Sequence, residues 1–404
     1  MTAEASAREP DVGGAAVNYD LVVIGGGING VGVAQAAAAA GHSVLLVETR
    51  ALAAGASSRS SKLIHGGLRY LESGNVQLVR EGLRERRLLL RLAPDLVHLR
   101  PFHIPVYPET RRRPWLLRLA LSIYAVLGGL RRAARFGLVP RRDWEALDGL
   151  RTDRLQAVFR YYDAQTDDAA LTAAVMKSAM SLGAELAMPA EFTGAELIAH
   201  GCRVDLATAA GGRTVAARVM VNAAGAWIDG VSRSVRPAVS RPPIELVQGA
   251  HIVLRGRLGR GLYYVESPRD GRAVFIMPWH TGQVLVGTTE TRFRGDPDRV
   301  CALATEVNYL QSVLRHYFPR FAAAGVADAF AGLRVLPAGI GHVFHRSRET
   351  VLATDRMLRP RMLTIIGGKL TSYRATAEQV MQRLSPSLPV RQPRARTDRL
   401  RLEP

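Results

Sequence analysis

The stretch that most constrains the fold runs from Tyr19 to Glu48, where an apolar run leads into a glycine-rich turn, a small-residue segment and a second apolar run. Leu21 to Ile24 is continuously apolar, as expected for a parallel strand that is buried on both faces. Gly25, Gly27 and Gly30 follow in G-x-G-x-x-G spacing. Such glycines permit a tight turn, a close approach of the backbone to a pyrophosphate, and close packing of the next helix on the strand.

The residues after this turn complete a nucleotide-binding unit. Val31 to Ala40 predicts a helix closed by Gly41, and Ser43 to Val47 predicts a second strand. Glu48 then stands where an acidic side chain can accept hydrogen bonds from the ribose hydroxyls of an adenosine dinucleotide. The pattern predicts a Rossmann-like unit and does not by itself distinguish NAD from FAD.

Length and composition indicate a globular protein. The 404 residues are 48% hydrophobic and 22% charged, which is enough for two lobes with a sizeable core. There is no uninterrupted apolar run of about 18 residues, so no transmembrane helix is predicted. Residues 1–18 lack the features of a signal peptide, and we expect them to form a disordered tail. Cys202 and Cys301 are isolated, so we expect a cytoplasmic protein with neither a disulfide framework nor a metal site.

The net charge of +19 suggests nucleic acid as a partner. The excess is scattered, however, and no basic stripe interleaves with aromatic residues, so we expect no nucleic-acid partner. Among 54 basic residues only Lys62, Lys177 and Lys369 are lysines. Lysine is a compact point charge and arginine a planar fork, so these lysines are candidates for positions where arginine will not serve.

A loop of small and polar residues from Ala54 to Tyr70 follows the second strand. It contains the hydroxyl groups of Ser57, Ser58, Ser60 and Ser61, and then the pair Gly66-Gly67. Such loops lie at the carboxyl ends of strands, where α/β sheets bind ligands, so we expect ligand contacts here. The alternative is a solvated loop whose polar side chains cap the helix that is predicted from Asn75 to Leu92.

Two later segments repeat the junction of strand, small residues and helix. Val219 to Asn222 leads into Ala224-Gly225, and Met362 to Ile366 leads into Gly367-Gly368-Lys369. A plain NAD dehydrogenase does not need the last junction, whereas the extended ring system of a flavin needs a backbone approach beyond the pyrophosphate. Further helices are predicted over residues 165–182 and 300–318, and alternating runs between residues 244 and 289 predict an antiparallel sheet.

An apolar stretch bracketed by arginine clusters extends from Arg111 to Phe136, with Trp115 near one end. This composition is typical of a helix that rests in a membrane interface. The alternative is a core helix whose arginine stems line the rim.

Seven motifs together make the chain resemble the FAD-dependent glycerol-3-phosphate dehydrogenases, within the D-amino-acid-oxidase-like flavoproteins. The resemblance covers about Tyr19 to Leu384, and its most specific blocks are Ser60 to Glu72 and Gly367 to Arg374. The other motifs are Ile24 to Gly30, Tyr162 to Asp168, Val221 to Trp227, Gly287 to Thr289 and Gly332 to Arg334.

The resemblance implies an α/β (α+β two-domain) fold, with a Rossmann-like FAD-binding domain and an inserted antiparallel-sheet substrate domain. We predict the FAD-binding domain over residues 19–92, 160–243 and 330–385, the substrate domain over 93–159 and 244–329, and a disordered basic tail over 386–404. The implied FAD contacts are Gly25, Gly27, Ile28, Asn29, Gly30, Glu48, Ser57, Ser58, Ser61, Lys62, Leu63, His65, Gly66, Gly67, Leu68, Ala224, Gly225, Gly368, Lys369, Leu370 and Thr371.

The same resemblance implies hydride transfer from a secondary carbinol carbon to flavin N5, and it places Arg334, Arg348 and Lys369 as cations that anchor the substrate phosphate. It also places His251 near the reacting carbon. The chemistry agrees, because phosphate prefers bidentate arginine and histidine suits general-base work. The alternatives are a core histidine for His251 and a surface residue for Arg348.

The predicted reaction is the oxidation of sn-glycerol 3-phosphate to dihydroxyacetone phosphate. The family's electron acceptor implies a quinone or another acceptor as partner, and we expect an anionic membrane surface and a homodimer as further partners. The family continues into a C-terminal helical domain, whereas this sequence stops soon after the terminal helix, and this favours a second hypothesis. In it the substrate is another hydroxy-phosphate, a hydroxyphosphonate or a hydroxy acid. The other departures from the family pattern are Val335 for the usual Pro, Ala170 for Arg and Glu290 for Asp.

Overall fold

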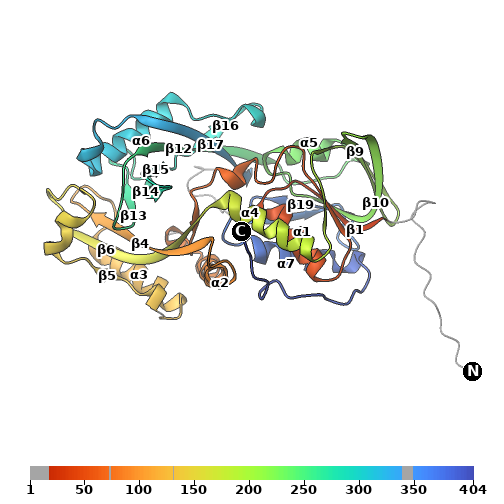
Figure 1. The fold of residues 1–404 in the computed structure, drawn as a ribbon, viewed down its shortest axis with the longest axis horizontal. Helices are drawn as coiled ribbons and strands as arrows, with labels where there is room; N and C mark the ends of the chain where they lie inside the picture. Colours follow the sequence, from red (N-terminus) through yellow and green to blue (C-terminus); the bar gives the residue numbers. More distant parts are fainter. Residues whose placement is uncertain (1–17, 72–73, 131, 339–348) are drawn as a thin grey trace, which may run out of the picture.

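The structure of the chain, a computed structural model, describes residues 18–71, 74–130, 132–338 and 349–404 (Figure 1). These residues form two lobes that lie next to each other along the long axis of the molecule, each built around one large sheet (Figure 1). The predicted N-terminal tail falls almost wholly outside the described residues.

The first sheet has a parallel centre, and nine strands of the described residues belong to it. β1 lies between β2 and β10 and is parallel to both, and β19 continues the parallel part beyond β10. The strands are β1 (Tyr19–Ile24), β2 (Val44–Val47), β7 (Glu185–Ala187), β8 (Ala190–Ile198), β9 (Gly201–Thr208), β10 (Gly211–Asn222), β11 (Val235–Arg236), β18 (Val351–Thr354) and β19 (Met362–Ile366).

Three helices cover one face of this sheet: α1 (Ile28–Ala39), α4 (Asp168–Ser181) and α7 (Tyr373–Leu384) (Figure 1). All six residues of β1 are buried, as the continuous apolar run predicts for a central parallel strand. The antiparallel strands β8 and β9 help to cover the opposite face. The carboxyl ends of β1, β2, β10 and β19 therefore meet at one edge, where a bound ligand is expected.

The second sheet is mostly antiparallel and contains ten strands of the described residues. Helix α6 (Ala304–Tyr317) packs on one face, and α2 (Val76–Leu92) and α3 (Pro114–Leu127) pack on the other. The strands are β3 (Leu63–Ile64), β4 (Val97–Val106), β5 (Gly137–Leu138), β6 (Ala157–Thr166), β12 (Ile244–Arg255), β13 (Leu262–Glu266), β14 (Ala273–Trp279), β15 (Gln283–Gly287), β16 (Thr291–Phe293) and β17 (Val326–Pro337).

Two strands join a different sheet from the one that the predicted domain boundaries suggest. β6 and β17 both belong to the second sheet, although most of each was assigned to the FAD-binding domain, and the boundaries themselves stay a prediction. β17 pairs along its length with β12, and β6 pairs with β4. The predicted helix over residues 165–182 begins only at Asp168, since Gln165 and Thr166 end β6. Local patterns indicate that a segment is extended, but they do not indicate which sheet it joins.

The prediction of a disordered C-terminal tail is wrong. The dark blue segment after α7 in Figure 1 runs along the first lobe and ends near α4. Arg391 pairs with the buried carboxylate of Asp20, with Nε and Oδ2 3.1 Å apart. The backbone N–H of Arg394 donates to the Ala39 carbonyl at 2.8 Å, and Leu402 is only 1% exposed. The arginine-rich composition suggested disorder, but arginines of this segment instead form an ion pair and a hydrogen bond with the first lobe.

Candidate functional site

A cavity of about 860 Å³ lies where the two sheets meet. Its walls include the carboxyl ends of β1, β2, β10 and β19 from the first sheet, and residues of β12, β14 and β17 from the second. The loop Ala54–Tyr70 lines it as well, apart from a few residues that point elsewhere. The cavity thus extends from the nucleotide-binding unit to the antiparallel sheet.

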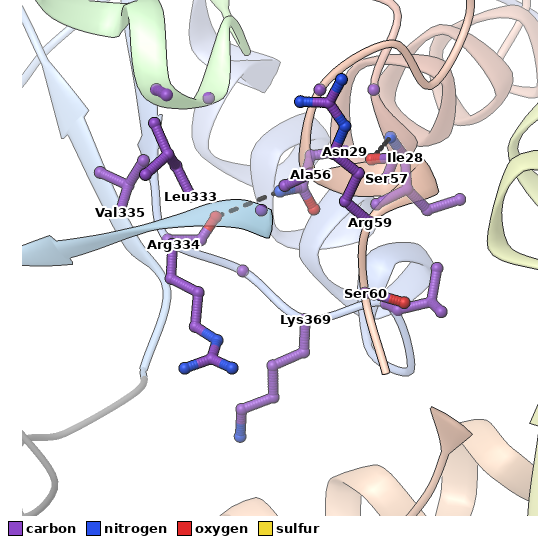
Figure 2. A pocket seen from close by; sticks show the side chains of 18 of the residues that line it. Ile28, Asn29, Ala56, Ser57, Arg59, Ser60, Leu333, Arg334, Val335 and Lys369 are labelled. Atoms are coloured by element: carbon purple, nitrogen blue, oxygen red, sulfur yellow. Dashed lines mark hydrogen bonds between the residues drawn. The ribbon is translucent and has the colours of Figure 1, made fainter. Parts of the chain in front are cut away.

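One end of the cavity is formed by the turn between β1 and α1. A Cβ atom at Gly30 would lie 1.9 Å from the Gly25 carbonyl oxygen, so glycine is required for the helix to pack on the turn. Ser57 Oγ accepts a hydrogen bond from the Ile28 N–H at 2.9 Å, which Figure 2 shows at the start of α1. Glu48 accepts a hydrogen bond from the Gly26 N–H at 2.7 Å. This end offers a helix N-terminus and a carboxylate side by side.

The other end is formed by the turn after β19. Gly368 has φ +108°, a backbone conformation that side chains other than glycine rarely adopt. Thr371 Oγ1 accepts from the His65 N–H at 3.1 Å, and this bond joins the turn to the loop Ala54–Tyr70. The buried Tyr124 hydroxyl accepts from the Gly66 N–H at 2.9 Å and donates to Asp163 at 2.8 Å. Gly66 lies in the part of the loop that lines the cavity, and the buried pair of Tyr124 and Asp163 fixes its backbone on the side away from the cavity.

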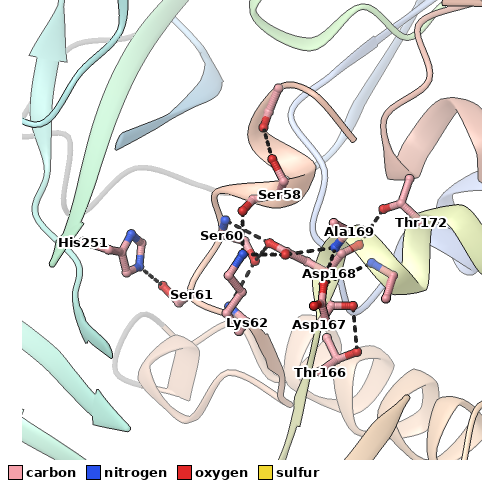
Figure 3. A network of polar contacts seen from close by, with 12 residues as sticks. Ser58, Ser60, Ser61, Lys62, Thr166, Asp167, Asp168, Ala169, Thr172 and His251 are labelled. Atoms are coloured by element: carbon pink, nitrogen blue, oxygen red, sulfur yellow. Dashed lines mark hydrogen bonds and ion pairs between the residues drawn. The ribbon is translucent and has the colours of Figure 1, made fainter. Parts of the chain in front are cut away.

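Lys62 is not among the residues that line the cavity, and its assignment as an FAD contact stays a prediction. It is 4% exposed, and its Nζ lies 2.6 Å from Asp168 Oδ1 (Figure 3). The rings of Trp279 and Phe330 lie 5.2 and 5.5 Å from the same nitrogen. Burial raises the pKa of the Asp168 carboxyl, and the Lys62 ammonium opposes this shift. A buried ammonium needs an acceptor, and the first turn of α4 supplies it.

The Ser58 hydroxyl donates to the Gly55 carbonyl, and Ser58 is not among the lining residues. Gly30 is not among them either, although its lack of a side chain lets α1 pack on the turn. Both residues stay predictions as FAD contacts. The other predicted FAD contacts all lie on the cavity wall: Gly25, Gly27, Ile28, Asn29, Glu48, Ser57, Ser61, Leu63, His65, Gly66, Gly67, Leu68, Ala224, Gly225, Gly368, Lys369, Leu370 and Thr371.

His251 lies in β12 on the cavity wall and is 1% exposed. Its ring stacks on Phe330 at 5.1 Å, and its Nε2 is 3.0 Å from Ser61 Oγ. Burial, together with the positive charges of Arg334 and Lys62, lowers the pKa of His251 to about 3. The imidazole is therefore neutral at physiological pH, as a proton acceptor must be.

Two of the predicted anchoring cations reach the same cavity. Arg334 comes from β17 and Lys369 from the turn after β19, and Figure 2 shows the two side chains extending in the same direction. Arg334 Nη2 donates to Thr288 Oγ1 at 3.2 Å, and its Nη1 lies 3.3 Å from Glu290 Oε1. Lys369 Nζ lies 3.9 Å from the centre of the Tyr70 ring. Arg348 lies outside the described residues.

The cavity wall also contains residues that the sequence prediction missed. Arg69, Tyr70 and Arg272 line the cavity, as does Thr288. Arg69 and Tyr70 stand inside the Ser60 to Glu72 block, so the motif itself was the signal that could have identified them. Arg272 has no comparable signal, because it lies just before β14 in a segment predicted only as part of a sheet.

The donor set fits the predicted flavin dinucleotide. Glu48 matches a ribose, the start of α1 matches a pyrophosphate, and the Gly367-Gly368 turn allows a planar ring to approach the backbone. These three features lie on the wall of one continuous cavity. Beyond the turn lie His251, Arg334 and Lys369, where a small anionic substrate would meet the ring.

Comparison with known proteins gives a consistent result. A family model described as DAO, FAD dependent oxidoreductase, matches residues 20–374. The chain is 36% identical to D-erythritol 1-phosphate dehydrogenase of Brucella abortus, an alignment covering 92% of this chain and 74% of that protein. It is 35% identical to glycerol-3-phosphate dehydrogenase of Pseudomonas aeruginosa, covering 91% of this chain and 72% of that protein.

Solved structures with the same fold include the glycerol-3-phosphate dehydrogenase of Bacillus halodurans complexed with FAD. It has a TM-score of 0.70 and 27% identity, and the match covers 95% of this chain and 67% of that chain. The FAD-bound L-alpha-glycerophosphate oxidase of Mycoplasma pneumoniae has a TM-score of 0.71 at 17% identity, with 91% and 94% covered. At that identity the second likeness supports the fold alone.

Proposed function

The chain belongs to the DAO family of FAD-dependent oxidoreductases, and from that membership we propose that it oxidises sn-glycerol 3-phosphate to dihydroxyacetone phosphate. Its cofactor is FAD, and it is an oxidoreductase of the type that acts on phosphorylated alcohols. The proposed substrate is supported mainly by one observation. Arg334, Lys369 and the neutral His251 line the same cavity.

Each residue has a distinct task in this reaction. Arg334 and Lys369 neutralise the substrate phosphate and orient the carbinol carbon, and Arg348 is proposed as a third cation. His251 takes the proton of the carbinol hydroxyl as the carbon is oxidised. FAD, when bound, supplies the acceptor for the hydride that leaves this carbon. The buried wall around His251 excludes water from the proton acceptor.

The proposal predicts substrate-dependent bleaching of the yellow holoprotein. Anaerobic addition of sn-glycerol 3-phosphate should abolish the absorbance of oxidised flavin, whereas glycerol at the same concentration should not, because it lacks the anchoring phosphate. A stopped-flow spectrophotometer measures both. Bleaching by glycerol, or by amino acids in place of phosphorylated alcohols, would contradict the proposal.

A second candidate substrate is D-erythritol 1-phosphate. It is favoured by the 36% identity to a D-erythritol 1-phosphate dehydrogenase and by Glu290, a carboxylate beside Arg334 on the cavity wall. Carboxylate oxygens accept hydrogen bonds from hydroxyl groups, and a longer polyol offers more of them. The same anaerobic experiment with both phosphates compares the two candidates directly. The broader hypothesis of a hydroxyphosphonate or hydroxy acid substrate is tested by adding those compounds.

We also propose that an anionic membrane surface is a partner, bound by α3. Leu117 and Leu121 form the buried face of this helix. Its side chains Trp115, Leu119 and Val126 are 68%, 51% and 61% exposed. The interfacial helix and the core helix were alternatives in the sequence, and α3 has features of both. In the described residues no helix combines the length and apolarity needed to cross a bilayer. A quinone acceptor and a homodimer stay predictions.

This membrane proposal predicts that the protein floats with anionic vesicles and less with neutral ones at low salt, because the chain carries a net charge of +19. Replacing Trp115 by Ala and Leu119 by Ser should lower the bound fraction by at least about tenfold, since burial of each such side chain contributes roughly 1.5–3 kcal/mol. Liposome flotation measures the effect.

The matched control replaces Met357 and Leu358 by Ser, two apolar side chains that are 82% and 81% exposed elsewhere on the surface. This control should bind vesicles like the wild type. Equal flotation of the wild type with and without anionic lipid would remove the proposal.

A further inference from the structure

We propose that Ser61 is a positioning residue, which fixes the orientation and the tautomer of His251 through its contact with Nε2. The expected effect on flavin reduction rests on the function proposed above, whereas the tautomer itself is a property of this chain. The role differs from the FAD contact that the sequence predicts for Ser61.

The His251 ring is packed closely on one face and along one edge. One face of the ring stacks on Phe330 with an angle of 16° between the ring planes. A Cβ atom at Gly287 would lie 2.0 Å from His251 Cδ2, so the ring edge lies directly against the backbone of β15. Packing therefore restricts the position of the ring, and hydrogen bonding determines which nitrogen carries the proton.

The two ring nitrogens of His251 differ in their hydrogen-bond partners. Nε2 is 3.0 Å from Ser61 Oγ, whereas the buried Nδ1 has no hydrogen-bond partner among the described residues. A proton on Nδ1 would be a buried donor without an acceptor, which is costly. A proton on Nε2 is donated to Ser61 Oγ. This second tautomer is favoured, and it leaves Nδ1 as the basic nitrogen.

Ser61 is held in place by hydrogen bonds of the residues on both sides of it. The residues on both sides of it are bound to one carboxylate, that of Asp168, whose side chain is 0% exposed (Figure 3). Ser60 donates to Asp168 Oδ2 through its backbone N–H at 3.0 Å and through its hydroxyl at 2.6 Å. Lys62 Nζ lies 2.6 Å from Asp168 Oδ1. Asp168 thus fixes the loop on both sides of Ser61, and the Ser61 hydroxyl contacts His251.

The test is ¹⁵N NMR of the histidine-labelled holoprotein without substrate, with the His251 signal identified by its loss in His251→Gln. We expect a neutral ring with the proton on Nε2. Ser61→Ala should shift the His251 signals, and Ser61→Thr should restore them in part because it retains a hydroxyl. Ser60→Ala, which loses one bond to Asp168, should produce a smaller shift. Ser58→Ala is the matched control in the same loop and should leave the signals unchanged.

The kinetic arm compares anaerobic flavin reduction in the same proteins. Ser61→Ala should slow reduction by about ten- to a hundredfold in protein saturated with FAD, the range expected for a lost buried hydrogen-bond partner. A proton on Nδ1, or His251 signals unchanged in Ser61→Ala, would overturn the inference. An unchanged reduction rate in Ser61→Ala would overturn it as well. If no candidate substrate reduces the wild type, the proposed function fails, and the NMR result still decides the role of Ser61.

Discussion

Replacing Arg334 by Met should lower kcat/KM for the phosphorylated substrate by about a hundred- to a thousandfold. A lost charge-assisted hydrogen bond costs about 1.5–3 kcal/mol. The effect should exceed this range, because Glu290 lies 3.3 Å from Arg334 and would be left without that cation, facing the substrate phosphate. Steady-state kinetics and anaerobic flavin reduction measure the loss, and the FAD content should stay unchanged.

Two further variants separate anion binding from an effect on His251. The charge of Arg334 lowers the pKa of His251, so its removal should raise that pKa and make the imidazole a stronger base. A slower reaction therefore cannot arise from a weaker base. Arg334→Lys should recover part of the activity, and Arg334→Met combined with Glu290→Gln should recover part of the loss by removing the repulsive carboxylate. Wild-type flavin reduction by Arg334→Met at limiting substrate would mean that the anion binds elsewhere.

The second large effect concerns stability. Replacing Arg374 by Met should lower the free energy of unfolding by about 3–5 kcal/mol, the usual cost of leaving one member of a buried ion pair unpaired. Arg374 Nε and Nη2 donate to the two carboxylate oxygens of Glu85 at 2.7 and 2.6 Å, and both side chains are nearly inaccessible to solvent. Arg374 Nη1 also donates to Thr397 Oγ1 at 3.0 Å, which joins α2, α7 and the C-terminal segment.

Urea unfolding of the FAD-saturated protein measures this change. Arg142→Ala is the control, because its ion pair with Asp143 is mostly solvent-exposed and should contribute at most about 1 kcal/mol. The double variant Arg374→Met/Glu85→Met should be more stable than Arg374→Met alone, since it leaves no unpaired charge on Glu85. Equal stability of Arg374→Met and Arg142→Ala would contradict the assigned role.

The local parts of the site could be predicted from the sequence. The turn from Gly25 to Gly30 and the acid at Glu48 belong to one short unit, and the Gly367-Gly368 junction marks the opposite end of the cavity. The cofactor and the family follow from these motifs, and the comparisons confirm both. Arg334, Lys369 and His251 were assigned by resemblance, and the structure brings them to one cavity while their roles stay proposals.

Charges and hydroxyl groups whose partners are distant in sequence could not be assigned in the same way. Lys62 pairs with Asp168, which lies 106 residues away, and Ser61 contacts His251, which lies 190 residues away. The serines of that loop are similar in sequence, yet Ser61 faces the cavity and Ser58 does not. Orientation along an irregular loop follows no period from which it could be read.

The nucleotide-binding unit could be predicted because its strand, turn and helix depend on backbone freedom and apolar contacts within about thirty residues, a distance over which pattern and spacing are informative. The packing of the arginine-rich C-terminal segment depends on contacts such as that of Arg391 with Asp20, which are 371 residues apart in the chain. The pairing of β6 and β17 with the second sheet likewise depends on distant partners. A buried charge or a strand edge needs a hydrogen-bonding partner, and the fold places that partner next to it from a distant part of the chain. Local sequence does not encode this proximity.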